Sequence, residues 1–115
     1  MDVLAESRVK GKLVVSESEE IKRDGARAQK NSGRGKTQKG DAVIGSFLYD
    51  VKEYEKSFSV SQNVWAKVCT DAYTANNKIP AIKIVLGKAN AKTRLWVIDD
   101  HTFHLMREAF EEKYG

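Results

Sequence analysis

Gly45-Ser46 separates two short runs of strand-forming residues, and this arrangement constrains the fold more than any other feature of the chain. A two-residue connection between such runs predicts a β-hairpin, and glycine at its first position favours a type II′ turn. With that turn at the tip, Asp41 lies directly opposite Asp50, and Lys52 follows two residues later on the same face of the sheet. The hairpin therefore predicts two carboxylates and an amine on one small patch.

Two carboxylates that face each other across a strand pair destabilise a sheet unless a positive charge neutralises them. Mg²⁺, or Mn²⁺ in its place, suits this patch, because Mg²⁺ binds one or two carboxylates together with water and phosphate oxygens. Such an ion polarises a phosphate and lowers the pKa of a bound water. We therefore interpret Asp41, Asp50 and Lys52 as candidate catalytic residues. Both aspartates and the Val51 carbonyl are candidate metal ligands. The alternative is that both aspartates face solvent and that Lys52 pairs with one of them.

The stretch from Lys22 to Lys39 carries seven basic residues against a single acid, Asp24, although the net charge of the whole chain is only +4. Basic side chains beside an acidic cluster suit a phosphate chain that approaches a bound metal ion. The glycine-rich part, residues 30–40, is predicted to be a mobile basic loop. The alternative is a solvated loop without a ligand. The candidate DNA-binding residues of this stretch are Arg27, Lys30, Ser32, Arg34, Lys36 and Lys39.

The remaining sequence predicts helices and strands in an order typical of a single α/β domain with a mixed sheet flanked by helices. Residues 1–12 are expected to form an N-terminal arm or a short edge strand. A first helix is expected over 17–23, where Ser16 and Glu19 fit a capping box and Gly25 ends the helix. The other expected elements are a strand at 26–29, a helix from Ser59 or Ser61 to Asn76, strands over 81–86 and 95–98 separated by a turn at 87–93, and a last helix capped by Asp100.

Apolar residues at helical spacing indicate which helix faces are buried. In the helix before Asn76 these are Val64, Trp65, Val68, Cys69, Ala72 and Tyr73, and in the last helix they are Phe103, Met106 and Phe110. Trp96 is also expected in the core. The single cysteine excludes an internal disulfide. No stretch approaches the roughly 18 apolar residues of a membrane span, and the N-terminus lacks an apolar signal core, so we expect no membrane association and a cytoplasmic location.

Gly40-Asp41 followed by Asp50-Val51-Lys52 resembles the P-D…(D/E)-x-K signature of the restriction-endonuclease-like nuclease superfamily. Within that superfamily, residues 17–86 resemble the archaeal-type and phage Holliday junction resolvases. Two positions depart from the pattern, because Gly40 replaces the usual proline and Asp50 stands where glutamate is commoner. The matching segments are Glu17, Asn31-Ser32-Gly33, Gly40-Asp41, Asp50-Val51-Lys52, Lys56-Ser57, the helix around Lys67 and the strand 79–84.

The resemblance implies a restriction-endonuclease-like αβββαβ core and a Mg²⁺-dependent endonuclease that hydrolyses phosphodiester bonds in branched DNA, above all in four-way (Holliday) junctions. It adds Glu17 to the catalytic and metal-binding candidates, with Glu20 as the fallback. It also adds Lys56 and Ser57 to the DNA-binding candidates. A two-fold symmetric junction needs two symmetric cuts, so a homodimer is expected. If the chain is encoded by a phage, its expected location is the host cytoplasm.

Two other functions stay open on the sequence. One is a non-catalytic nucleic-acid-binding module that uses the basic loop alone. The other is a related nuclease that acts on flaps, nicks or duplex DNA. A pure binding module avoids acids next to phosphate, so the facing carboxylates favour a nuclease.

Overall fold

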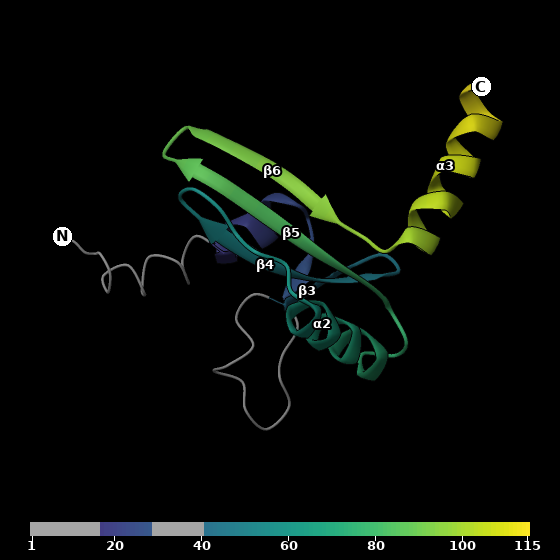
Figure 1. The fold of residues 1–115 in the computed structure, drawn as a ribbon, viewed down its shortest axis with the longest axis horizontal. Helices are drawn as coiled ribbons and strands as arrows, with labels where there is room; N and C mark the ends of the chain where they lie inside the picture. The colour runs from purple at the N-terminus through teal and green to yellow at the C-terminus, as the bar shows by residue number, and fades with distance from the viewer. Residues whose placement is uncertain (1–16, 29–40) are drawn as a thin grey trace.

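The sheet has five strands in the order β2-β3-β4-β5-β6 in the computed structural model, which describes residues 17–28 and 41–115 (Figure 1). Among the strands that the structure describes, only β4 and β5 run parallel, so the sheet is mixed. The predicted N-terminal arm, Ser16 of the capping box and the basic loop lie outside the described residues. The strands are β2 (Arg27–Ala28), β3 (Asp41–Ile44), β4 (Phe47–Tyr54), β5 (Ile79–Lys88) and β6 (Ala91–Val97).

The predicted hairpin is confirmed. Strands β3 and β4 pair antiparallel, with Ile44 opposite Phe47 at the tip and Asp41 opposite Asp50 at the open end. Gly45 has a φ of 57°, a left-handed value that the first central position of a type II′ turn requires and that costs glycine no steric strain. The length of this turn fixes the register of the strand pair.

Helices cover both faces of the sheet, as the sequence predicts. The first helix, residues 17–23, packs Ile21 against one face, and α2 (Gln62–Thr74) covers the other face (Figure 1). Successive residues of a strand point to opposite faces, so β4 contributes to both cores. The core under the first helix contains Ile21, Ala42, Tyr49, Val51, Ala81 and Val85. The core under α2 contains Val43, Leu48, Val68, Ala72, Ile82 and Ile84.

Helix α2 carries the chain from β4 to the parallel strand β5. Of the two predicted caps, Ser61 is the N-cap, and its Oγ accepts a hydrogen bond from the Val64 amide at 3.2 Å. The helix ends before Asn76 and Asn77, which both have left-handed φ values, a conformation that asparagine tolerates.

The predicted apolar face of α2 is confirmed at its centre and wrong at its edge. Val68 and Ala72 are buried, whereas the Tyr73 side chain is 73% exposed. Cys69 is half-buried, and burial raises the pKa of its thiol, as expected for a structural cysteine. The buried stripe is therefore narrower than the sequence pattern suggests.

Strands β5 and β6 are longer than predicted. The turn expected over 87–93 is confined to Ala89-Asn90, and Gly87 pairs with Lys92 inside the strands. A Cβ atom on Gly87 would lie 2.1 Å from the Ala91 carbonyl oxygen, so this glycine permits a close approach of two backbones rather than a turn. Trp96 on β6 is 47% exposed, and the prediction that it lies in the core is wrong.

Helix α3 (Asp100–Tyr114) extends away from the sheet beyond the end of β6 (Figure 1). Its N-cap is Asp99 rather than the predicted Asp100, because the Asp99 carboxylate accepts the Thr102 amide at 3.2 Å. Phe103 and Phe110 share one side of the helix as predicted, but both are exposed in the described part of the chain.

The described elements confirm an α/β architecture with a mixed sheet between helices. The predicted order of helix, three strands, helix and strand is found across residues 17–88, and β6 and α3 follow it. Neither α2 nor α3 is long and apolar enough to cross a membrane, and the same holds for the described residues of the first helix.

Candidate active site

Asp41 and Asp50 are register partners across the β3–β4 pair, on the face of the sheet that α2 covers. Asp41 is 4% exposed, and the Asp50 side chain is 16% exposed. Lys52, two residues further along β4, places its Nζ 3.1 Å from Asp50 Oδ2. The structure thus brings together the three residues that the hairpin predicts, with Asp41 buried and Asp50 half-buried rather than both in solvent.

Helix α2 adds a third carboxylate and a second amine that the sequence analysis missed. Asp71 shares a side-chain hydrogen bond with Asp41, and Lys67 Nζ lies 2.9 Å from Asp71 Oδ2. Lys67 and Asp71 each precede a buried residue of α2, Val68 and Ala72. An acid and a base four residues apart at the border of an apolar stripe is a signal that could have found them.

Burial is the main reason why the Asp41 carboxyl holds a proton tightly. Burial first, and then the negative charges of Asp50 and Asp71, raise the pKa of Asp41 to about 7 against the opposing effect of Lys67. The hydrogen bond from a protonated Asp41 to the Asp71 carboxylate acts in the same direction. The Asp71 hydrogen bond in turn raises the pKa of Lys67. The protein thus holds more negative charge on this patch than its own lysines neutralise.

The donor set fits a hard divalent cation. Asp41 and Asp50 offer carboxylate oxygens, and the cation would relieve the repulsion that raises the pKa of Asp41. Within residues 17–28 and 41–115, no group of three or more histidine, cysteine or acidic side chains is arranged to hold a metal. Two protein carboxylates completed by water and phosphate oxygens is the arrangement that Mg²⁺ commonly takes.

Glu20, the fallback for the first-helix glutamate, lies on the other face of the sheet. Its carboxylate accepts two hydrogen bonds from Arg94, at 3.0 and 2.9 Å, and contacts Lys83 Nζ at 2.8 Å. The Arg94 hydrogen bonds are the largest influence on this carboxyl, and with Lys83 they lower the pKa of Glu20 to about 2. Glu20 is therefore committed to ion pairs away from Asp41.

The same network fixes the first helix on the sheet. Lys83, whose side chain is 2% exposed, bonds Asp24 at 2.7 and 2.9 Å, and the Tyr49 hydroxyl donates to Asp24 at 2.7 Å. Residues 17, 20, 21 and 24 share one side of a helix, so Glu17 belongs to the side that docks. Glu17 is half-buried at the start of the described helix, and its place in a metal site stays a prediction.

The Val51 side chain points into the core under the first helix, away from the acid pair. The predicted ligand is the Val51 backbone carbonyl. Because β3 begins at Asp41, the register partner of Asp50, Val51 has no register partner in β3. The carbonyl's role as a ligand stays a prediction.

The predicted DNA-binding residues are described only in part. Arg27 is exposed on β2, and Lys56 and Ser57 are exposed just after β4. Lys30, Ser32, Arg34, Lys36 and Lys39 lie outside the described residues.

Without divalent metal, the free energy of unfolding should fall as pH rises from about 5 to about 8. The pKa of Asp41 is about 7 in the folded protein against an ordinary 3.8, so the folded state keeps a proton that the unfolded state has lost. Urea denaturation in chelator should show a loss on the order of 1–4 kcal/mol across this window. Asp41→Asn should flatten the profile, and Asp100→Asn, at an exposed acid of α3, should not. A parental protein that gains stability over this range would contradict the raised pKa.

Comparisons of this chain with protein-family models, with curated proteins and with solved structures gave no match.

Proposed function

We propose that this protein is a metal-dependent, structure-selective DNA endonuclease that resolves four-way junctions by hydrolysing phosphodiester bonds. The observation that carries the proposal is the facing pair of the buried Asp41 and the half-buried Asp50, with Lys52 beside it. A purely structural role would not favour two acids facing each other at the open end of a hairpin, where the repulsion destabilises the fold. The restriction-endonuclease-like fold is part of the proposal, and the element order over residues 17–88 supports it.

Each residue of the patch has a role in the proposed reaction. Asp41 and Asp50 would hold a Mg²⁺ ion, with Glu17 and the Val51 carbonyl as further ligands. When bound there, Mg²⁺ would polarise the phosphate and lower the pKa of a water molecule. The Lys52 ammonium donates hydrogen bonds to the oxygens that gain negative charge as the phosphate is attacked. Asp71, held by Lys67, keeps the Asp41 carboxyl turned toward the patch.

We also propose that the protein acts as a homodimer. A four-way junction presents two equivalent strands related by a two-fold axis, and one patch can cut only one of them at a time. Two patches related by the same symmetry would make both cuts in one encounter. The dimer interface is left open by this argument.

The test is cleavage of a labelled four-way junction beside its matched duplex and single strand, each with Mg²⁺ and with excess chelator. We expect the junction to be nicked symmetrically in Mg²⁺ or Mn²⁺, and chelation to abolish cleavage because the acids alone cannot activate water. Ca²⁺ should support binding but little cutting. Full activity in chelator would overturn the mechanism. Preferential cutting of the duplex would show that four-way junctions are not the substrate. Binding without any cleavage would favour a non-catalytic module.

A further inference from the structure

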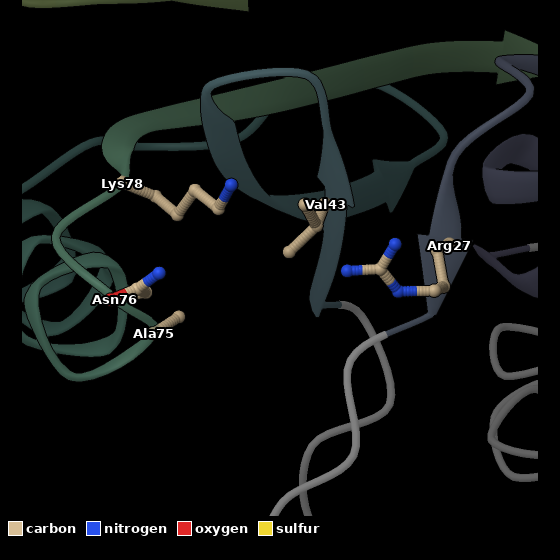
Figure 2. A pocket seen from close by; sticks show the side chains of 5 residues that line it. All are labelled: Arg27, Val43, Ala75, Asn76 and Lys78. Carbon is tan, nitrogen blue, oxygen red and sulfur yellow. The ribbon is translucent and has the colours of Figure 1, made fainter.

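A pocket of about 340 Å³ opens between the outer strands of the sheet and the end of α2. It is lined by Arg27, Val43, Ala75, Asn76 and Lys78. Figure 2 shows the Arg27 guanidinium and the Lys78 side chain reaching toward Val43 from opposite sides. The two cations come from segments 51 residues apart in sequence, so only the fold brings them to one pocket.

The pocket lies on the same face of the sheet as the acid pair. Arg27 is the register partner of Val43, so their side chains share a face. Asp41 is two residues from Val43 along β3, about 7 Å away at the usual rise of a strand. Helix α2 runs beside both, because Asp71 contacts Asp41 and Ala75 lies one turn later at the pocket. The pocket is thus the immediate neighbour of the candidate active site.

The charge of the pocket favours an anion. Within the described residues, the Arg27 guanidinium has no hydrogen-bond or ion-pair partner, and Lys78 Nζ donates one hydrogen bond, to the Gly45 carbonyl at 3.1 Å. An ammonium has three donors and a guanidinium has five, so most remain available. Among residues 17–28 and 41–115, no acidic residue lines the pocket.

The end of α2 opposes this charge only weakly. A helix C-terminus carries about half a negative charge, concentrated on its unsatisfied carbonyls. Here the carbonyls of Asp71, Ala72 and Tyr73 accept hydrogen bonds from the Ala75, Lys78 and Asn77 amides. Two full positive charges therefore outweigh a capped helix end.

We propose that the pocket of Arg27, Asn76 and Lys78 binds a backbone phosphate of the DNA strand, within about two nucleotides of the phosphate at the Asp41–Asp50 pair, since each nucleotide adds 3.4 Å of rise. The inference rests on the proposed function, because it takes DNA as the ligand. It adds Lys78 and Asn76 to the candidate DNA-binding residues, and it gives Arg27 a backbone phosphate as its partner. The two cations would hold the strand in line while the neighbouring patch acts on it.

The experiment measures binding without cleavage, so it stands apart from the test of the nuclease. A fluorescein-labelled duplex and a labelled four-way junction are titrated in chelator at several salt concentrations, with the parent, Arg27→Gln, Lys78→Gln and the double variant. Each single substitution should weaken binding by about 3- to 10-fold and reduce the salt slope by about one. If both cations hold one phosphate, the double variant should lose less than the two single losses combined.

Lys88→Gln is the matched control, because Lys88 ends β5, the strand that begins directly after Lys78, and it forms an exposed pair with Glu55. It should leave affinity and slope almost unchanged, and its effect should add to that of Arg27→Gln. Lys78→Arg should retain parental binding, which separates lost charge from lost folding. Parental affinity and slope in Lys78→Gln, or full additivity of Arg27→Gln and Lys78→Gln, would overturn the proposal.

Inorganic phosphate distinguishes a DNA strand from a small anion. At matched ionic strength, phosphate should not raise the melting temperature of the parent above its value in potassium chloride. A phosphate-specific rise that Lys78→Gln removes would assign the pocket to a small anion instead and would overturn the DNA assignment. If the variants reduce the salt dependence of DNA binding but the parent protein never cuts DNA, the phosphate-binding pocket is supported and only the proposed nuclease activity is refuted.

Discussion

Asp41→Asn should reduce cleavage of a four-way junction by at least about 100-fold while DNA binding stays equal or becomes tighter. Removing the charge weakens the Mg²⁺ site, and the proposed activation of water depends on that site. Without metal, the same charge repels DNA phosphates, so its loss favours binding. Cleavage in Mg²⁺ and binding in chelator, measured on the same labelled junction, separate the two effects.

Asp50→Asn should behave in the same way, because Asp50 is the register partner of Asp41. Lys52→Ala should also abolish cleavage, but it leaves Asp50 without its ion-pair partner and so should not stabilise the fold. Asp100→Asn, at an exposed acid of α3, is the control and should cut at the parental rate. An Asp41→Asn variant with parental cleavage would place the active site elsewhere.

Lys83→Met should destabilise the protein by about 3–5 kcal/mol, because it leaves the half-buried Asp24 without its cation and the buried Glu20 with Arg94 as its remaining one. Lys83 Nζ lies within 2.9 Å of both acids, and its side chain is almost fully buried. Because a domain of this size is commonly stable by about 5–15 kcal/mol, the loss takes a large share of the total. Urea denaturation at neutral pH, followed by circular dichroism, measures it.

Lys88→Met on the same strand is the matched control, since its pair with Glu55 is exposed, and it should change the free energy of unfolding very little. Adding Asp24→Asn to Lys83→Met should recover part of the lost stability, because it removes the carboxylate that loses its cation, whereas Glu20 keeps Arg94. If Lys83→Met does not fold, Lys83→Arg should fold with a smaller loss. Equal losses for Lys83→Met and Lys88→Met would show that the buried network contributes nothing beyond a surface pair.

The acid pair could be predicted because a local rule determines it. A two-residue turn with glycine first fixes the register, so the sequence alone places Asp41 opposite Asp50. The cap at Ser61 and the end of the first helix before Gly25 follow from equally local rules. The turn predicted to begin at Gly87 was wrong, because glycine is found at close approaches of two backbones as well as in turns.

The remaining features of the site depend on contacts between distant parts of the chain. Asp71 meets Asp41 from thirty residues away, and Lys83 meets Asp24 across 59 residues. The periodicity of apolar residues predicts single helices and strands, but it does not predict contacts between residues this far apart in the sequence. The burial of Lys83 could not be predicted from the sequence either. A lysine in an apolar strand normally indicates an exposed edge strand.

The hairpin makes the candidate site sensitive to insertions in a way that its own residues do not reveal. One residue added at Gly45-Ser46 would shift β4 by one position against β3, and a shift of one turns every side chain of the strand to the opposite face. Asp50 would then point toward the core that Tyr49 and Val51 now fill, and the two acids would part with neither of them mutated. A chain with this architecture can vary the length of its other connections, but not of this one, without losing the site.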